Sequence, residues 1–569
     1  MNRGKICGDD ELKDTVLSIL NEENNDFYHE LENFNYYKYH YCLNYLRENL
    51  FIWYPFKKEG SLLEIGAGYG QLTNLFCEKV NKVVSVENDE KLLQILSKRC
   101  TCDNLTVLTD DFSHIEYDEK FDYIILCDIF EYAIQFSDSK NPYSDYLSYV
   151  KSFLKDDGVI LIAISNRLGL KYFAGFKEEH VNKFFAGIDD FPKVDYVKTF
   201  SKTELENILK SVGFDNYKFF YPYPDHCFPD VISTDDFINK LPYARAPVYY
   251  DVKANLFKEH KLNQIFANDN IAQYFSNSFL VEINNSNDNN RTENIKYVKL
   301  NTNRDEKFRT STGIYLEDGE LKVRKSPLSL KSVNHLKNMY EAYDYDFGKI
   351  KFLANEFDGE NFTYSFIEDN TFEKFLIDSI MLNNKDEFYS LLEYFFDALF
   401  YESYVTKDYA TEEFLNIFKL KSDIPFHCHD VTNLDVIFNN LFIIDDEITS
   451  IDYEWFFKFP IPLEYVFYRV IRHHTVTNPL FRDFESMENI FNHFDLDVDN
   501  FEMFRQWELN FAGYVYSGLI KPEVKRIPNK LINKLEDFDS INKERLMMKN
   551  SRSWKITKPL RKIISTVKR

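Results

Sequence analysis

The chain has 569 residues, enough for more than one hydrophobic core, and its apolar content of 44% is typical of a globular protein. A formal net charge of −24 opposes general binding to nucleic-acid phosphates. The eight cysteines are too scattered for a zinc site or a disulfide framework, no apolar stretch could span a bilayer, and no apolar core follows the start to form a signal peptide. These features predict a cytoplasmic protein with no nucleic-acid partner.

The first 60 residues are predicted to form a helical cover. Residues 9–33 are acidic with a helical pattern, and residues 34–56 carry an aromatic helix that runs into the first strand. Core packing is the favoured role for most of these aromatic side chains, whereas His40 is equally suited to a core and to an active site.

A glycine-rich turn follows the first predicted strand. Residues 60–70 read Gly-Ser-Leu-Leu-Glu-Ile-Gly-Ala-Gly-Tyr-Gly, and a helix is predicted over 71–80. Glycines there allow a sharp turn and close approach of the backbone to a ligand, and the amides at the helix start can hold an anionic group. A dinucleotide fingerprint would have its third glycine at position 71; that residue is Gln71, which disfavours NAD.

The next predicted strands end in acidic residues, as in a doubly wound sheet. The strand over 82–86 ends in Glu87, where such a sheet places the carboxylate that binds ribose hydroxyls. Strands over 105–108 and 121–127 lead to Asp111 and Asp128. Farther on, the pattern predicts a helix over 146–154, a strand over 158–165, a substrate-side insertion over 166–200, a helix capped by Ser201 and Glu204, and a closing strand over 218–223.

With these motifs, roughly residues 30–230 closely resemble a class I S-adenosylmethionine (SAM)-dependent methyltransferase, a Rossmann-like α/β fold. The resemblance implies that Glu87 binds the ribose, that Asp111 and Phe112 lie against the adenine, and that Asp128 lies beside the cofactor near the substrate mouth. The SAM-binding residues that it implies are Glu64, Gly66, Ala67, Gly68, Tyr69, Gly70, Glu87, Asn88, Asp111, Phe112 and Asp128.

The methyltransferase pattern assigns no general base. Tyr132 stands where many relatives carry His after Glu131. A sugar hydroxyl acceptor would need a base, for which His180 and His40 are candidates, whereas a phosphate acceptor would need none.

A second unit is predicted to begin near residue 275. Strands are expected over 278–283, 295–300, 308–316 and 320–325, with an Asn-rich hairpin or linker over 284–294. A helix over 330–343, strands near 350–357 and 362–367, and a helical region follow.

Within the helical region, Asp435 and Asn440 lie five residues apart in a predicted catalytic loop, and a strand hairpin then leads to Asp452. Asp435 is predicted to accept a hydroxyl proton, and Asn440 and Asp452 to hold Mg²⁺ on nucleotide phosphates. Lys325 ends a strand in the place of a phosphate-pairing lysine, with Glu341 as its expected partner.

Roughly residues 275–480 resemble the aminoglycoside/choline-kinase branch of protein-kinase-like folds, an α+β architecture, which implies ATP and Mg²⁺ as ligands. The chain departs from that pattern at Asn433, where the family has His, and in the loop over 301–307, which has no glycine to hold phosphates. A working kinase and a kinase-shaped module that binds a sugar or partner therefore both remain open.

The chain ends in a basic tail. Residues 545–569 contain nine basic residues and no acidic one. Such a tail suits peripheral contact with an anionic membrane at its inner face, and it equally suits a solvated tail that balances an acidic body. The predicted division of the chain is a helical cover at 1–60, a methyltransferase domain at 61–230, a connecting region at 231–274, a kinase-like domain at 275–480, C-terminal helices at 481–544 and the tail at 545–569.

This combination is similar to bacterial surface-polysaccharide modifying proteins that fuse a kinase to a methyltransferase. The resemblance implies a SAM-dependent methyltransferase that acts on a cell-surface glycan or its lipid-linked precursor, with a second domain that phosphorylates or binds the acceptor. The alternative is a non-catalytic glycan- or partner-binding protein that retains both folds.

Overall fold

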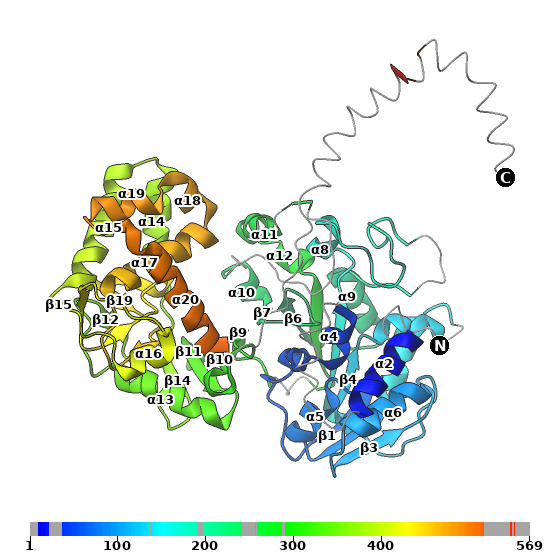
Figure 1. Cartoon of the computed structure of the whole chain (residues 1–569). Coiled ribbons are helices and arrows are strands. Elements are labelled where there is room, and N and C mark those ends of the chain that lie inside the picture. Colours follow the sequence, from blue (N-terminus) through cyan, green and yellow to red (C-terminus); the bar gives the residue numbers. More distant parts are fainter. Residues whose placement is uncertain are drawn as a thin grey trace.

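The fold is organised around a long sheet shared by both halves of the chain. The computed structural model describes residues 9–21, 37–136, 139–191, 197–241, 256–257, 259–286, 291–516, 547–548 and 551. Within these residues the sheet has thirteen strands, in the order β13 (Glu356–Phe357), β14 (Phe362–Ser365), β11 (Glu320–Pro327), β10 (Thr310–Glu317), β9 (Ile295–Leu300), β7 (Val231–Thr234), β6 (Asn216–Tyr223), β8 (Ser278–Asn284), β5 (Leu154–Ser165), β4 (Phe121–Cys127), β1 (Ser61–Ile65), β2 (Lys82–Val86) and β3 (Leu105–Leu108). Figure 1 shows the ends of the sheet in two lobes, with β7 and β9 between them.

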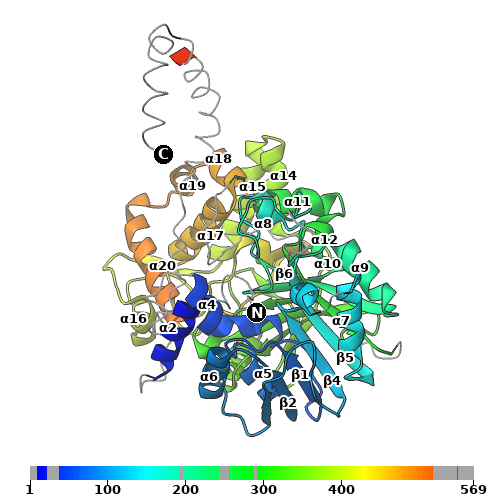
Figure 2. The ribbon, with the colours of Figure 1, turned by 90° about the vertical axis from the view of Figure 1, so that its right-hand side faces the viewer.

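The first half is a doubly wound α/β unit, as predicted. Strands β3, β2, β1, β4 and β5 pair in parallel, and β8 lies antiparallel between β5 and β6. Figure 2 shows β2, β1, β4 and β5 side by side. The helices of this half are α2 (Asp10–Asn21), α4 (Tyr37–Leu43), η1 (Tyr45–Leu50), α5 (Thr73–Lys79), α6 (Glu90–Arg99), η2 (Phe130–Gln135), α7 (Pro142–Lys151), α8 (Leu170–Phe173), α9 (Lys202–Ser211), α10 (Asp235–Ile238), α11 (Glu259–Asn268) and α12 (Ala272–Phe275).

Local chemistry explains several of these elements. The predicted capping box is confirmed at α9, where the Ser201 side chain accepts from the Glu204 amide and the Glu204 side chain accepts from the Ser201 amide. Strand β4 is buried along most of its length because apolar residues cover both faces of a central parallel strand.

Strand β8 corrects the predicted boundary near residue 275. It was expected to open the second unit, but it is hydrogen-bonded between β5 and β6 in the first half. The reason is its apolar content: Phe279, Leu280, Val281 and Ile283 are all buried, which suits a central strand rather than the edge of a new sheet.

The connecting region predicted at 231–274 is also part of the fold. Strand β7 pairs with β6 on one side and with β9 on the other, so the backbone hydrogen-bond ladder continues into the second half. The helices α10, α11 and α12 lie in the same region, while residues 242–255 and 258 fall outside the described residues.

The second half continues the sheet with the antiparallel strands β9, β10, β11, β14 and β13. The segment 284–294 ends β8 and leads to β9, and its residues 287–290 lie outside the described part. Smaller strands and helices follow: η3 (Glu306–Phe308), η4 (Leu330–Ser332), α13 (Val333–Ala342), β12 (Lys351–Phe352), α14 (Phe372–Met381), α15 (Lys385–Phe400), β15 (Tyr404–Thr406), α16 (Glu412–Phe418), β16 (Phe426–Cys428), β17 (Thr432–Asn433), η5 (Phe438–Asn440), β18 (Leu441–Ile444), β19 (Glu447–Ser450), β20 (Phe456–Phe457), α17 (Leu463–Thr477), α18 (Pro479–Phe484), α19 (Met487–His493), η6 (Val498–Asn500) and α20 (Phe501–Tyr516).

The C-terminal helices α18, α19 and α20 share one core with the rest of the second half. Phe481, Ile490 and Trp507 are buried together with Phe372 of α14 and Leu434. The boundary predicted at residue 480 therefore does not divide two cores. The basic tail lies outside the described residues apart from 547–548 and 551. Among the described helices, none is long and apolar enough to cross a membrane.

Candidate functional site

The predicted glycine turn connects β1 to α5. Gly66, Gly68 and Gly70 have φ values of +83°, +57° and +68°, a backbone region that L side chains rarely adopt. A Cβ on Gly70 would lie 3.0 Å from Leu96 Cδ1 and from Cys100 Sγ. Glycine at this position therefore serves both the turn and the close packing of α6.

Two buried carboxylates lie beside the glycine turn. Glu87, at the end of β2, is fully buried; its Oε2 accepts the Gly68 amide at 2.9 Å and its Oε1 accepts the Asn88 amide at 2.8 Å. Glu64 Oε2 accepts the hydroxyls of Ser85 (2.6 Å) and Thr73 (2.8 Å), and burial raises the pKa of the Glu64 carboxyl to about 7. The structure thus brings Glu64 and Glu87 together around the predicted glycines.

The other predicted cofactor residues lie at the ends of neighbouring strands. Asp111 follows β3, is exposed, and accepts the Ser113 amide at 2.9 Å. Phe112, expected against the adenine, is fully buried and packs against Phe136 with ring centroids 5.9 Å apart. Because β1, β2 and β3 are parallel, their carboxyl ends form one edge, where open α/β sheets bind ligands.

The N-terminal helices α2 and α4 pack against the glycine turn at this edge. Tyr69 of the glycine turn is fully buried in a cluster with Leu12 and Val16 of α2 and with Cys42 of α4. The Tyr41 hydroxyl donates to Asp128 Oδ2 at 2.8 Å. Phe51 and Tyr54, which follow α4, are buried in a core, while Tyr41 reaches the predicted substrate side.

Asp128, at the end of β4, is the centre of a polar cluster. Its Oδ1 lies 2.5 Å from His226 Nε2, and Arg47 Nη2 donates to its Oδ2 at 3.2 Å. Burial alone would raise the pKa of Asp128, but the charges of His226 and Arg47 hold it well below its ordinary value. In the same way Asp128 outweighs burial and raises the pKa of His226 well above its ordinary value.

His226 is the functional candidate that the sequence analysis missed. It follows β6 in the segment Pro222–Pro229, which reads from sequence as a break in the strand pattern. Since β6 and β5 both pair antiparallel with β8, β6 runs parallel to β5 and ends at the same edge as β4. The sequence signal that could have identified His226 is its position shortly after a strand that ends at this ligand-binding edge of the sheet.

The two histidines that the sequence analysis proposed as bases have other surroundings. His180 Nδ1 lies 3.2 Å from the Tyr132 hydroxyl, and burial lowers the pKa of His180. His40 Nδ1 lies 3.2 Å from Asn44 Nδ2 within α4 and the residues that follow it. His180 is thus in the insertion after β5, beside Tyr132, whereas His40 is part of the N-terminal cover.

A second polar cluster lies in the second half, around Lys325 of β11. Lys325 Nζ lies 2.7 Å from Asp452 Oδ1 and 3.5 Å from Glu454 Oε2. The predicted partner Glu341 instead pairs with Lys458 at 2.8 Å on the surface. The expected Lys325–Glu341 pair was therefore wrong: Glu341 is not among the buried residues of α13, and Glu454, which follows Asp452 by two residues, supplies the carboxylate.

Glu454 joins three positively charged or titratable groups in this cluster. Arg304 Nη1 lies 2.5 Å and His335 Nε2 lies 3.2 Å from Glu454 Oε1. Burial opposes the ionisation of Glu454, but Arg304 and Lys325 hold its pKa well below the ordinary value. A buried carboxylate that is ionised in this way must keep its partners.

The predicted catalytic loop is ordered around Asp435. Its amide donates to Asn433 Oδ1 at 2.9 Å, and Asn440 Nδ2 donates to the Asp435 carbonyl at 3.0 Å. The Asp435 carboxylate accepts the Trp455 amide at 2.9 Å, and burial, with Asp452 and Glu454, raises its pKa to about 7. Asn433, in the place of the expected His, thus orders the loop with its side-chain amide.

The glycine-free loop over 301–307 lies between this cluster and the first half. Tyr45 of η1 donates to the Thr302 carbonyl at 3.1 Å, and the Thr302 hydroxyl donates to Asn49 Oδ1 at 2.7 Å. The same loop carries Arg304, which contacts Glu454. Helix η1 also carries Arg47, so one short helix contacts Asp128 of the first polar cluster and the loop that carries Arg304 of the second.

Comparisons with known proteins match the N-terminal half of the chain to methyltransferases. Residues 45–139 match the family model described as "Ribosomal RNA adenine dimethylase". The ribosomal RNA small subunit methyltransferase A of Mycoplasmopsis pulmonis is 33% identical over 69 residues, which are 12% of this chain and 27% of that protein. An uncharacterized methyltransferase of Staphylococcus carnosus is 27% identical over 155 residues, 27% of this chain and 69% of that protein.

Solved structures that match part of this chain include two methyltransferases. The plantazolicin methyltransferase in complex with SAH has 13% identity and a TM-score of 0.26, covering 48% of this chain and 95% of that chain. A SAM-dependent methyltransferase from Archaeoglobus fulgidus has 16% identity and a TM-score of 0.26, covering 42% and 92%. From its strand order, its glycine turn and the family match, the N-terminal half has the class I SAM-dependent methyltransferase fold.

Proposed function

We propose that the first half transfers a methyl group from SAM. The observation that supports this most directly is the turn of three glycines at positive φ, with Gly68 hydrogen-bonded to the carboxylate of Glu87. Bound SAM supplies a methyl group on a cationic sulfur. In our proposal the backbone of the glycine turn contacts the cofactor, and Glu87 accepts hydrogen bonds from the ribose hydroxyls. Asp111 and Phe112 lie on the adenine side, and Asp128 lies on the substrate side.

Binding of S-adenosylhomocysteine to the purified chain tests this proposal. We expect a low-micromolar Kd by calorimetry, on the order of −7 to −8 kcal/mol. Glu87→Ala should weaken binding by roughly 1.5 to 3 kcal/mol, because the ribose hydroxyls lose a charged acceptor. Glu90→Ala, an exposed carboxylate in the first turn of α6, is the matched control and should bind like the wild type. Equal affinities in the two variants would contradict this cofactor site.

We further propose that the second half is a protein-kinase-like module that phosphorylates or binds the acceptor. Its support is the arrangement in which Lys325 contacts Asp452, and Asn440 orders the loop of Asp435. With ATP and Mg²⁺ bound, which supply the phosphoryl group, Asp452 and Asn440 would hold the metal and Lys325 the phosphates. Asp435, with a pKa of about 7, suits removal of a hydroxyl proton near neutral pH.

A thermal-shift experiment separates a nucleotide-binding module from a kinase-shaped one. If the module binds ATP, we expect a rise in Tm only with Mg²⁺ present, because the metal bridges carboxylate and phosphates. Asp452→Ala should abolish the rise and leave S-adenosylhomocysteine binding intact, which also shows that the variant folds. Glu447→Ala, exposed on the neighbouring strand β19, is the control. No rise with ATP or GTP would support the non-catalytic module.

For the acceptor we propose a glycan of the bacterial cell surface or its lipid-linked precursor. The support is that one chain joins a proposed SAM site and a proposed nucleotide site. The same proposal includes a cytoplasmic location and contact of the basic tail with the inner face of the membrane. A non-catalytic protein that binds such a glycan is the alternative, and failure of both binding experiments above would favour it.

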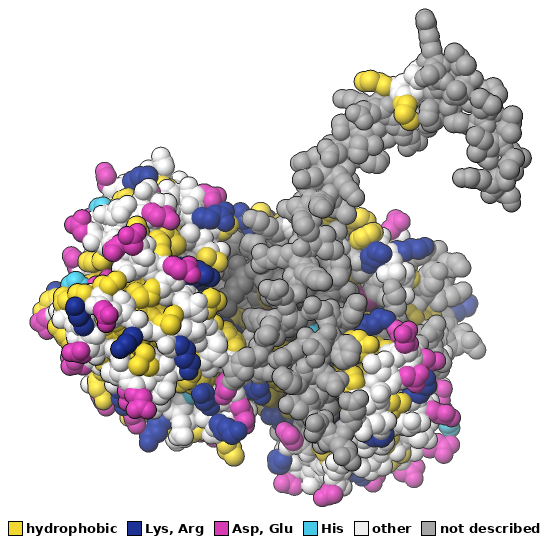
Figure 3. Space-filling view, viewed as in Figure 1, with side chains coloured by type: hydrophobic (Ala, Val, Ile, Leu, Met, Phe, Trp, Pro, Cys, Tyr) yellow, Lys and Arg dark blue, Asp and Glu magenta, His cyan; other side chains and the backbone are white. Residues whose placement is uncertain are grey.

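Ribosomal RNA is a second candidate acceptor because of the matched family model. That match ends at residue 139, before the segment with His226 and before the whole second half. The net charge of −24 also opposes RNA phosphates, and Figure 3 shows Asp and Glu interspersed with Lys and Arg on the visible face of both halves. We therefore favour the glycan.

A further inference from the structure

Three buried polar atoms near Asp128 have no hydrogen-bond partner among the described residues: Arg47 Nε, Glu131 Oε2 and His226 Nδ1. Their side chains come from η1, from η2 after β4, and from the segment after β6, and each residue is at most 3% exposed. The charges of Arg47, Glu131 and His226 all interact with Asp128. Leaving a buried polar atom unpaired costs about 1 to 3 kcal/mol, so three of them in one region indicate a ligand site.

The protonation states make all three atoms hydrogen-bond donors near neutral pH. Arg47 is always charged, and its Nε carries a hydrogen. Asp128 raises the pKa of His226 well above its ordinary value, so that Nδ1 also carries a hydrogen. Burial, together with Asp128, raises the pKa of the Glu131 carboxyl to about 8, and its unpaired Oε2 is the oxygen available to hold the proton. Such a set of donors suits oxygen atoms that carry negative charge.

A metal ion is a poorer occupant of this region. Asp128, His226 and Cys227 do place possible ligand atoms within 4.8 Å of one another. However, the guanidinium of Arg47 contacts Asp128 Oδ2 at 3.2 Å, and its fixed positive charge opposes a cation there. The same charge favours an anion.

We propose that Arg47, Glu131 and His226 bind an oxyanion, the carboxylate or phosphate group of the methyl acceptor. This inference rests on the proposed methyltransferase function and specifies the class of substrate. Glu131 and His226 follow β4 and β6, and Arg47 contacts Asp128 at the end of β4. The predicted cofactor residues other than Asp128 lie in or after β1, β2 and β3, so the two ligands would lie side by side along one edge of the sheet. An oxyanion carries its own electron pair: the new bond forms between its oxygen and the methyl carbon as the carbon–sulfur bond breaks, and no proton has to be removed.

This assignment also explains why no general base could be assigned from the sequence. The His226 ring contacts Asp128, which follows β4, and the neighbouring Cys227, while Arg47 and Tyr41 from the N-terminal cover contact Asp128. Asp128 is committed to the ion pair with His226. The imidazole is therefore a charged donor, and His226 acts on the acceptor by binding it.

The test is calorimetric titration of the full chain, saturated with S-adenosylhomocysteine, with inorganic phosphate in one arm and acetate in the other. We expect an anion to bind, and His226→Gln, which keeps a hydrogen bond to Asp128 without the charge, to lower that affinity at least tenfold. The affinity for S-adenosylhomocysteine should stay within twofold of the wild type. His114→Gln, an exposed histidine after β3, is the control and should change neither affinity. Tighter binding of phosphate would identify a phosphate acceptor, and tighter binding of acetate a carboxylate.

Two results would overturn the inference while leaving the methyltransferase proposal standing. One is binding of S-adenosylhomocysteine with no anion binding in either arm. The other is an equal loss of both affinities in His226→Gln, which would assign the donors to the carboxylate of the cofactor. If no S-adenosylhomocysteine binds at all, the proposed function itself fails. Should His226→Gln not fold, nitrogen NMR of the wild-type histidines decides: we expect His226 to be protonated on both ring nitrogens at neutral pH, and a neutral ring would contradict the proposal.

Discussion

Replacing Glu454 by Ala should destabilise the protein by about 3 to 5 kcal/mol, the cost of removing one partner from a buried ion pair. Glu454 is 6% exposed, and its carboxylate contacts Arg304 at 2.5 Å, His335 at 3.2 Å and Lys325 at 3.5 Å. Without it, Lys325 keeps Asp452, but Arg304 loses its charged partner inside the second half. Chemical unfolding at neutral pH, followed by tryptophan fluorescence, measures the change.

Glu341→Ala is the control for this experiment. Glu341 occupies the position expected from sequence to pair with Lys325, but its carboxylate pairs with Lys458 at the surface. We expect its replacement to leave the unfolding midpoint unchanged, because exposed ion pairs contribute little. A larger loss of stability for Glu341→Ala than for Glu454→Ala would reverse the assignment of the Lys325 partner.

The contribution of Glu454 to folding stability depends on pH with a defined sign. The pKa of Glu454 is lowered in the folded state, so its stabilising contribution is present above the pKa of the unfolded carboxyl group and is lost as the pH falls through the folded pKa.

The first half was largely predictable because its signals are local. The strands β1 to β4 are short apolar runs bounded by glycine or acidic residues, and the predicted ranges 82–86, 105–108 and 121–127 are the observed β2, β3 and β4. The glycines of the turn are likewise found at positive φ. The capping box at Ser201 depends only on residues three positions apart.

The features that sequence reasoning missed depend on contacts between distant residues. Strand β8 was recognised as a strand, but its place between β5 and β6 is decided by tertiary pairing across more than a hundred residues of chain. From the sequence, Glu341 and Glu454 are both possible partners of Lys325. In the structure Glu454 contacts Lys325, whereas Glu341 pairs with Lys458. His226 acquires its role from Asp128, 98 residues earlier in the chain.

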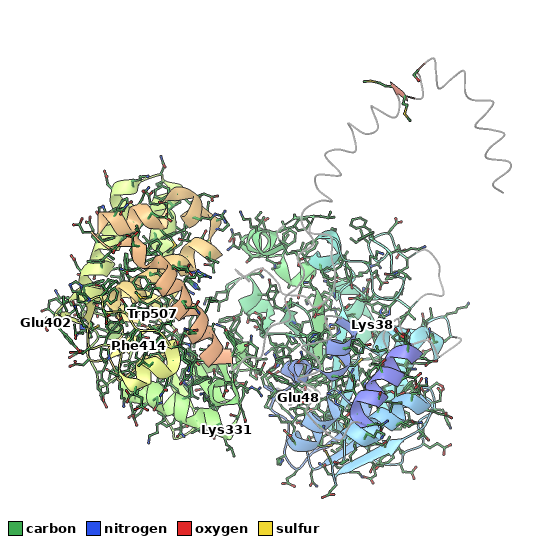
Figure 4. All side chains as sticks on the ribbon, in the orientation of Figure 1. Lys38, Glu48, Lys331, Glu402, Phe414 and Trp507 are labelled. Atoms are coloured by element: carbon green, nitrogen blue, oxygen red, sulfur yellow. The ribbon has the colours of Figure 1, made fainter. Side chains whose placement is uncertain are left out.

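Replacing Trp507 by Ala should also destabilise the protein by about 3 to 5 kcal/mol, as large aromatic truncations in a core do. Trp507 is fully buried in α20; its ring lies 5.4 Å from that of Phe414 of α16, and its Nε1 donates to the Leu420 carbonyl at 3.0 Å. Figure 4 shows Trp507 and Phe414 next to each other within the second half. Trp507→Phe should cost less, since it keeps most of the buried area, and Leu509→Ala, exposed on the same helix, should be neutral.

The Trp507 variant also tests whether α20 supports the loop over 301–307 in the second half. The Asp305 amide donates to the Val515 carbonyl of α20 at 2.8 Å, and the ring of Phe308 lies 5.1 Å from that of Tyr514. Loosening α20 should therefore loosen the loop over 301–307, which carries Arg304, and raise amide hydrogen exchange in that loop. Exchange that rises only in α20 itself would show that the C-terminal helices are an appendage, as the boundary predicted at residue 480 implies. Exchange that rises in both would make α20 part of the support of the second polar cluster.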